Sequence, residues 1–172
     1  MRLFIAFDCK QLSGSLRSIQ EKLPYKGFRL VSWFHITLKF LGEVDDMKIP
    51  RIISILSEVR MDKITVSLSE VGCFPSPKAP RIVWVSVWPQ DRLHDLKKDI
   101  DDSLLQDFDA DTGFTPHITL ARISPGKRPA HFHKLISSLK APPDKAIFDQ
   151  FKLMKSTLTG IGPVYEEVAR FP

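Results

Sequence analysis

The tetrapeptide His-Ile-Thr-Leu occurs twice in the sequence, at residues 35–38 and at residues 117–120. Each copy lies in a stretch that predicts a β-strand, in which successive side chains point to opposite faces. The isoleucine and the leucine of each copy should therefore pack inward together. The histidine and the threonine should share the other face, with their Cα atoms roughly 6.6 Å apart.

The order of the elements around the two copies is also repeated. From Arg2 the pattern is strand, helix, strand with the tetrapeptide, helix and strand, and the same order follows Arg81. The spacing from arginine to histidine is 35 − 2 = 33 residues in the first case and 117 − 81 = 36 residues in the second. We therefore predict one two-lobed domain over residues 1–172, with halves at approximately 2–74 and 81–171 related by an approximate two-fold axis.

Hydrophobic periodicity predicts four helices, at about residues 12–23, 46–59, 91–108 and 131–139. It also predicts strands at residues 2–8, 28–34, 35–44, 64–74, 81–88, 115–123, 147–158 and 164–171. Because the connections mix hairpins with helical crossovers, the fold class we expect is α+β, with antiparallel sheets, outer helices and a central cleft. A doubly wound α/β fold is the alternative.

Composition narrows the class of protein without defining a function. The chain of 172 residues is long enough for a core and contains no apolar run that could span a membrane and no secretory signal. Cys9 and Cys73 are too few for a disulfide framework or a thiolate metal site, and they suggest reduced thiols in a cytoplasmic protein. The net charge of +5 is compatible with a polyanionic partner.

Two histidines and two threonines on the polar faces of neighbouring strands would suit displacement at a phosphate. Because histidine titrates near neutral pH, one imidazole can take a proton from water while the other protonates the leaving oxygen. The hydroxyls of Thr37 and Thr119 can donate hydrogen bonds to the non-bridging phosphate oxygens. The spacing does not show whether His35 or His117 is the acid.

The remaining histidines give no second site. His131 and His133 form a His-x-His pair on a predicted helix, but no further ligand is spaced to complete a zinc site, and His94 lies among charged residues. We expect His131 and His133 to be solvated or partly packed and His94 to lie on the surface. The sequence also has no phosphate-binding P-loop, dinucleotide fingerprint or Gly-x-Ser-x-Gly motif.

Several segments in one order extend the pattern over nearly the whole chain. They are MRLFIAFD at 1–8, HITLKFLGEV at 35–44, VGCFPSPKAPRIVWVSV at 71–87, FTPHITLAR at 114–122 and LMKSTLTGIGPVYEEVARF at 153–171. With these segments the chain resembles the 2H phosphoesterase superfamily. Within that superfamily it is similar to the RNA 2′,3′-cyclic phosphodiesterases, which were formerly called 2′-5′ RNA ligases.

The resemblance implies an active cleft between two lobes and hydrolysis of a 2′,3′-cyclic phosphate to a 2′-phosphomonoester, without metal or other cofactor. It implies that His35 is the general acid and His117 the general base. The expected partner is RNA with a 2′,3′-cyclic phosphate end or a small cyclic-phosphate nucleotide, and the expected state is a monomer. The alternatives are ATP-independent 2′-5′ RNA ligation, non-catalytic binding of RNA ends and hydrolysis of small nucleotide cyclic phosphates.

The resemblance also indicates Phe40 as a base-stacking surface and Arg122 as a cation that binds phosphate or orders the cleft. Strand alternation counted from the histidines places both on the Ile/Leu face, so a bulge or a strand end would be needed to bring them to the cleft. One departure from the family pattern precedes the first motif, where Trp33 and Phe34 stand in place of a polar, loop-like stretch. These aromatic rings could pack the lobe or line the nucleotide site, and we favour packing.

Overall fold

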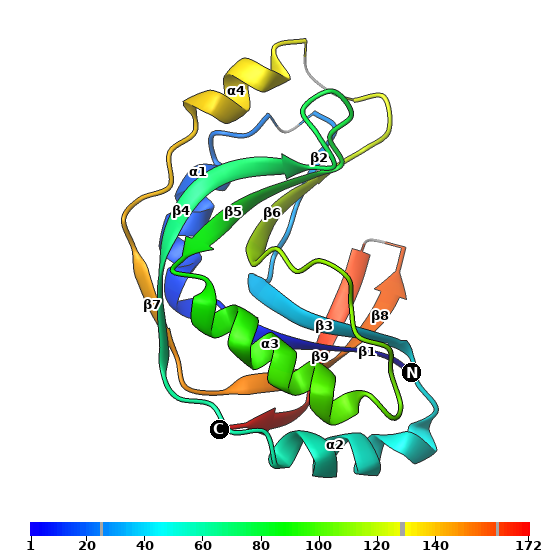
Figure 1. The fold of residues 1–172 in the computed structure, drawn as a ribbon. Helices are drawn as coiled ribbons and strands as arrows, with labels where there is room; N and C mark the ends of the chain where they lie inside the picture. The colour runs from blue at the N-terminus through cyan, green and yellow to red at the C-terminus, as the bar shows by residue number, and fades with distance from the viewer. Residues whose placement is uncertain (25, 128–129, 161) are drawn as a thin grey trace.

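The computed structural model describes residues 1–24, 26–127, 130–160 and 162–172, and Figure 1 shows the arrangement of the chain. The strands are β1 (Arg2–Asp8), β2 (Phe28–Leu30), β3 (His35–Glu43), β4 (Ile64–Phe74), β5 (Ile82–Trp88), β6 (His117–Ile123), β7 (Lys145–Phe148), β8 (Phe151–Thr159) and β9 (Gly162–Phe171). The α-helices are α1 (Ser13–Gln20), α2 (Ile49–Ser57), α3 (Asp91–Leu104) and α4 (Phe132–Ser138).

The nine strands of the described residues belong to one sheet, which curls instead of lying flat (Figure 1). The order is β7-β4-β5-β6-β3-β1-β8-β9, and β2 pairs with β6 beside this path. Every pairing is antiparallel. The prediction of an α+β fold is therefore confirmed, and the doubly wound alternative is wrong because its sheet would be mostly parallel.

The two copies of the tetrapeptide meet at the centre of the sheet. Strands β3 and β6 pair through Ile36 and Ile118, the second residues of the two copies. On their other sides β3 pairs with β1, and β6 pairs with β5. The isoleucine and leucine side chains of both copies are buried, as their alternation predicted. Their polar neighbours are therefore held on the opposite face. The division into two repeat halves stays a prediction.

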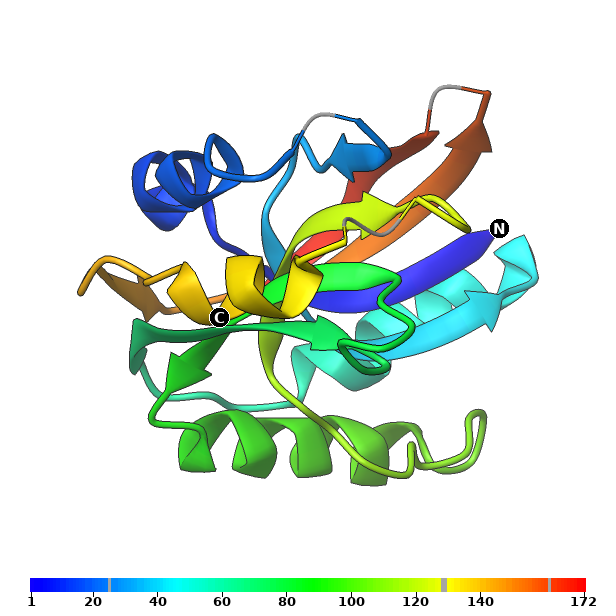
Figure 2. The same cartoon turned by 90° about the horizontal axis from the view of Figure 1, so that it is seen from above.

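The helix that precedes each motif strand in the sequence packs against the other motif strand. Helix α1 packs against β6, whereas α3 packs against β3. The apolar stripes predicted for both helices are buried, including Leu16 and Ile19 of α1 and Leu93 and Ile100 of α3. Figure 2 shows these two helices on opposite sides of the molecule. No helix in the described ranges is both long and apolar enough to cross a membrane.

Two predicted strands differ from the structure. The predicted strand at 147–158 is two strands, because the chain breaks after Phe148 and β7 pairs with β4 whereas β8 pairs with β1. The polar pair Asp149 and Gln150 interrupts the alternation, and the buried positions change from Ala146 and Phe148 to Phe151 and Leu153. This local pattern does not show that the two pieces have different partners. The predicted strand at 28–34 ends at Leu30, although the Val31 amide still donates to the Leu120 carbonyl oxygen of β6 at 3.0 Å before the chain continues to the start of β3.

Candidate active site

A cavity of about 480 Å³ lies where β3 and β6 meet. His35, Thr37, His117 and Thr119 all line it. The pairing of Ile36 with Ile118 explains this convergence, since each isoleucine lies between the histidine and the threonine of its own strand. The structure therefore brings together the four residues that the sequence predicted to face one cleft.

A bulge in each motif strand changes which face the following residues occupy. In β3, Ala6 pairs with Thr37 and Ile5 pairs with Lys39, so Leu38 is an extra residue without a partner. In β6, Leu120 is extra in the same way. An extra residue shifts the alternation by one, which is how a bulge redirects the side chains beyond it.

The two bulges carry Phe40 and Arg122 to the cavity. Both side chains line it, and Phe40 is 65% exposed although it is a large apolar residue. The simple count along the strand had placed both residues on the buried face, and that count fails at Leu38 and Leu120. The bulges stand at equivalent positions, directly after the two threonines.

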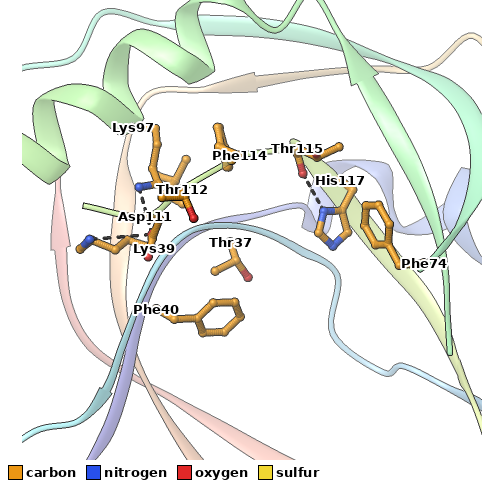
Figure 3. A pocket seen from close by; sticks show the side chains of 12 residues that line it. Thr37, Lys39, Phe40, Phe74, Lys97, Asp111, Thr112, Phe114, Thr115 and His117 are labelled. Atoms are coloured by element: carbon orange, nitrogen blue, oxygen red, sulfur yellow. Dashed lines mark hydrogen bonds and ion pairs between the residues drawn. The ribbon is translucent and has the colours of Figure 1, made fainter. Parts of the chain in front are cut away.

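The His117 ring is held by a hydrogen bond to the backbone two residues before it. Its Nδ1 atom lies 2.7 Å from the Thr115 carbonyl oxygen (Figure 3). Because a carbonyl can only accept, Nδ1 carries the proton, and the neutral ring has its lone pair on Nε2. Burial lowers the pKa of His117, and the nearby charge of Arg122 lowers it further, while the Thr115 carbonyl opposes both. The neutral ring is therefore suited to accept a proton.

His35 is held by aromatic rings instead. Trp33 stacks on the imidazole with ring centroids 4.3 Å apart and an interplanar angle of 21°. Phe4 and Tyr165 contact the same ring, with centroids at 5.5 Å and 5.4 Å. The Nδ1 atom is buried and makes no hydrogen bond within the described residues, although the Trp33 carbonyl lies near enough to act on the ring. His35 and His117 are thus fixed by different means.

Burial among these rings lowers the pKa of His35 to about 4. The Trp33 carbonyl and the charge of Asp8 oppose this shift, whereas the charge of Arg122, and that of His117 when it is protonated, add to it. The free protein therefore holds His35 neutral at neutral pH. A bound phosphate anion would favour the protonated ring, because an opposite charge nearby stabilises the charged form.

The two aromatic residues before the first motif have separate positions. Phe34 is buried in the main core, as the packing hypothesis predicted. Trp33 packs in a second, smaller apolar cluster with Phe4 and Tyr165, against the His35 ring. Tyr165 also lines the cavity, and the sequence analysis missed it. Nothing in its local pattern shows that β9, at the edge of the sheet, brings the Tyr165 ring to the His35 imidazole.

A buried ionic network connects β3 to the segment that leads into β6. Lys39, which is 1% exposed, donates to Asp101 of α3 at 2.7 Å and to the Asp109 carbonyl at 2.7 Å. Lys97 bonds to Asp101 and also pairs with Asp111 at 3.0 Å. Burial alone would raise the pKa of Asp101, but the hydrogen bonds from the two lysines outweigh it and lower that pKa. Figure 3 shows part of this network beside Thr37, Phe40 and His117.

The other histidines lie apart from the cavity. His131 and His133 are exposed at α4, and exposed His94 contacts the edge of the Phe114 ring at 5.1 Å. Within the residues that the structure describes, no group of three or more His, Cys, Asp or Glu side chains is arranged to hold a metal ion.

The curled antiparallel sheet and the paired His-x-Thr strands are the features of a 2H phosphoesterase. A family model described as LigT like Phosphoesterase matches residues 7–84 and 86–165. The chain belongs to this family.

Similar proteins extend over the full length of the chain. A Thermotoga maritima protein named RNA 2′,3′-cyclic phosphodiesterase is 35% identical, with 96% of this chain and 92% of that protein covered. A Methanocaldococcus jannaschii protein of the same name is 32% identical, with 98% of both covered. The solved structure of TT0787 from Thermus thermophilus is 26% identical with a TM-score of 0.81, and covers 99% of this chain and 97% of that chain. E. coli LigT has the same fold at 24% identity, with a TM-score of 0.78, and covers 98% of this chain and 95% of that chain.

Proposed function

We propose that this protein hydrolyses the 2′,3′-cyclic phosphate at the end of an RNA chain to a 2′-phosphomonoester. The observation that carries the proposal is the convergence of two imidazoles and two hydroxyls on one cavity. The similar proteins named RNA 2′,3′-cyclic phosphodiesterases indicate the substrate. His117 is assigned as the general base and His35 as the general acid.

The reaction begins with a water molecule beside His117. The bare Nε2 atom of His117 accepts a proton from this water, and the water oxygen bonds to phosphorus. The bond between phosphorus and the 3′ oxygen breaks on the opposite side, and His35 gives its proton to that oxygen. The products are a 2′-phosphate and a free 3′ hydroxyl. Since the two imidazoles supply both proton transfers, the step requires no metal ion.

The two threonines stabilise charge on the phosphate. The hydroxyls of Thr37 and Thr119 line the cavity with the imidazoles, and each can donate to a non-bridging oxygen while negative charge increases there. The burial of Ile36 and Ile118 between these polar residues fixes the two strands. The donors are therefore positioned before the substrate binds, which is the condition for effective electrostatic stabilisation.

Phe40 and Arg122 are assigned to the substrate around the reacting phosphate. The exposed ring of Phe40 offers a face on which the terminal base can stack. The guanidinium of Arg122 can bind phosphate oxygens through two parallel hydrogen bonds. Arg122 lines the same cavity as both imidazoles and lowers the pKa of each, so we assign it to ordering the cleft as well.

Turnover of adenosine 2′,3′-cyclic phosphate in the presence of a chelator tests this proposal. We expect a 2′-phosphate product by ³¹P NMR, and a rate at least about 10²-fold lower for His35→Ala and for His117→Ala. His133→Ala is the matched control, since His133 is exposed on α4 outside the cavity. Loss of activity on adding chelator, or a 3′-phosphate product, would contradict the mechanism.

A further inference from the structure

The cavity carries positive charge that its own lining does not neutralise. Arg2, Arg29 and Arg122 line it, and no Asp or Glu is among the described residues that do so. Elsewhere on the molecule arginines pair with carboxylates, as Arg51 does with Asp107 at 3.0 Å. An excess of one charge in a cleft attracts a ligand of the opposite charge.

Arg29 and Arg122 face each other directly across two strands. They are register partners in the antiparallel pairing of β2 with β6, and both side chains are exposed. Like charges at directly opposite positions destabilise a sheet. In the part of the chain that the structure describes, neither arginine makes an ion pair or a side-chain hydrogen bond. An anion bound between them would remove this repulsion.

A small side pocket opens from the cavity at these arginines. Its volume is about 90 Å³, and it shares Arg29, Arg122, Pro163 and Tyr165 with the main cavity. Ser32 also lines it, and it too has no carboxylate among its described lining residues. Pockets for whole organic ligands usually measure about 300 Å³ or more, so this one suits a small group such as a phosphate.

We infer that Arg29 and Arg122 hold a second phosphate of the substrate, the one on the 5′ oxygen of the ribose that carries the cyclic phosphate. This inference rests on the proposed function and adds Arg29 as a specificity-determining residue. In an RNA end that phosphate is the last internucleotide linkage. In a small nucleotide it is a 5′ phosphate or diphosphate, which offers the same oxygens to the same guanidinium groups.

The arrangement of charges places the two phosphates side by side. Arg122 lines both the main cavity and the side pocket, and its charge reaches both imidazoles. A phosphate held by Arg29 would therefore be the neighbour of the phosphate held by the histidines. Because charge-assisted hydrogen bonds are strong, a substrate with the second phosphate should react at least about tenfold faster in kcat/KM than one without it.

The experiment compares three substrates. They are adenosine 2′,3′-cyclic phosphate, the same nucleoside with an added 5′ phosphate, and a dinucleotide that ends in the cyclic phosphate. We expect kcat/KM of the wild-type protein to rise at least about tenfold for the second and third substrates. In Arg29→Ala, the kcat/KM for the second and third substrates, divided by that for the first, should fall towards one. Arg29→Lys should keep part of the wild-type preference. Arg17→Ala removes the same charge from the exposed outer face of α1 and should keep the full ratio.

The outcomes separate this inference from the proposed function. If none of the three substrates is hydrolysed, the proposed function itself is wrong. If all three are hydrolysed with equal kcat/KM, or if Arg29→Ala keeps the wild-type ratio, the second phosphate site is wrong and the proposed function stands. A preference for the dinucleotide alone would also overturn the site, because it would show recognition of the second nucleoside and not of its phosphate.

Discussion

Replacing Trp33 by alanine tests how the fold controls the protonation of His35. Trp33 covers one face of the imidazole at 4.3 Å, and burial is the largest cause of the lowered pKa of His35. Without the indole, water should reach that face of the ring. Solvation favours the charged form of an imidazole, so the pKa of His35 should rise in Trp33→Ala.

The size of the effect follows from the position of this pKa. The pKa of His35 is lowered from 6.5 to about 4, and the difference of 6.5 − 4 = 2.5 corresponds to about 3 kcal/mol of proton affinity. Trp33 is one of three rings around the imidazole, and it is the one stacked face to face. Its removal should restore at least about a third of the difference, which places the pKa of His35 at about 5 or higher.

A pH titration of the histidine ring protons by NMR measures this change. Trp33→Phe is the matched variant, because it keeps an aromatic ring on the imidazole and should move the pKa of His35 much less. His117 serves as an internal reference, since its aromatic neighbours are Phe74 and Trp84, and its pKa should stay where it is. A pKa of His35 that remains near 4 in Trp33→Ala would refute the reasoning.

Two further predictions concern stability. The folded protein holds His35 neutral down to about pH 4, whereas the unfolded chain takes up a proton below about 6.5, so the contribution of His35 to the unfolding free energy should fall as pH falls through this window. Urea unfolding at several pH values should show a weaker pH dependence for His35→Gln than for the wild type, and equal slopes would contradict this. Lys39→Met leaves buried Asp101 with one lysine in place of two and should lower the unfolding free energy by about 3 kcal/mol. Lys98→Met removes a lysine from an exposed ion pair and should leave the urea midpoint of unfolding unchanged. An equal loss of unfolding free energy in both variants would contradict the claim that burial makes the Lys39 ion pair important.

Much of the fold could be predicted because the elements show strong periodicity. The stripes of α1 and α3 and the alternation of the tetrapeptides each specify one buried face, and these faces are buried in the structure. The different partners of β7 and β8 could not be predicted, because an alternating segment reads alike whether it is the edge strand β7 or the internal strand β8. Pairing partners depend on contacts between distant segments, and a local pattern does not contain them.

In the candidate site, too, features that depend on the local sequence pattern could be predicted, whereas features that depend on contacts between distant segments could not. The face shared by His35 and Thr37 follows from strand alternation alone. The bulges at Leu38 and Leu120 do not, because an extra residue in a strand leaves no distinct local pattern in these segments. The aromatic contact of Tyr165 and the pairing of Arg29 with Arg122 depend on strands that are far apart in the sequence.

The central claim is that His35 and His117 act on opposite sides of one phosphate, as acid and as base. Its most direct test uses a 2′,3′-cyclic phosphate whose 3′ bridging oxygen is replaced by sulfur, because a thiolate leaves without needing a proton. We predict that His35→Ala reaches a kcat/KM within about tenfold of the wild type on this analogue, while His117→Ala stays at least about 10²-fold lower. Rescue of His117→Ala instead, or of neither variant, would contradict the account.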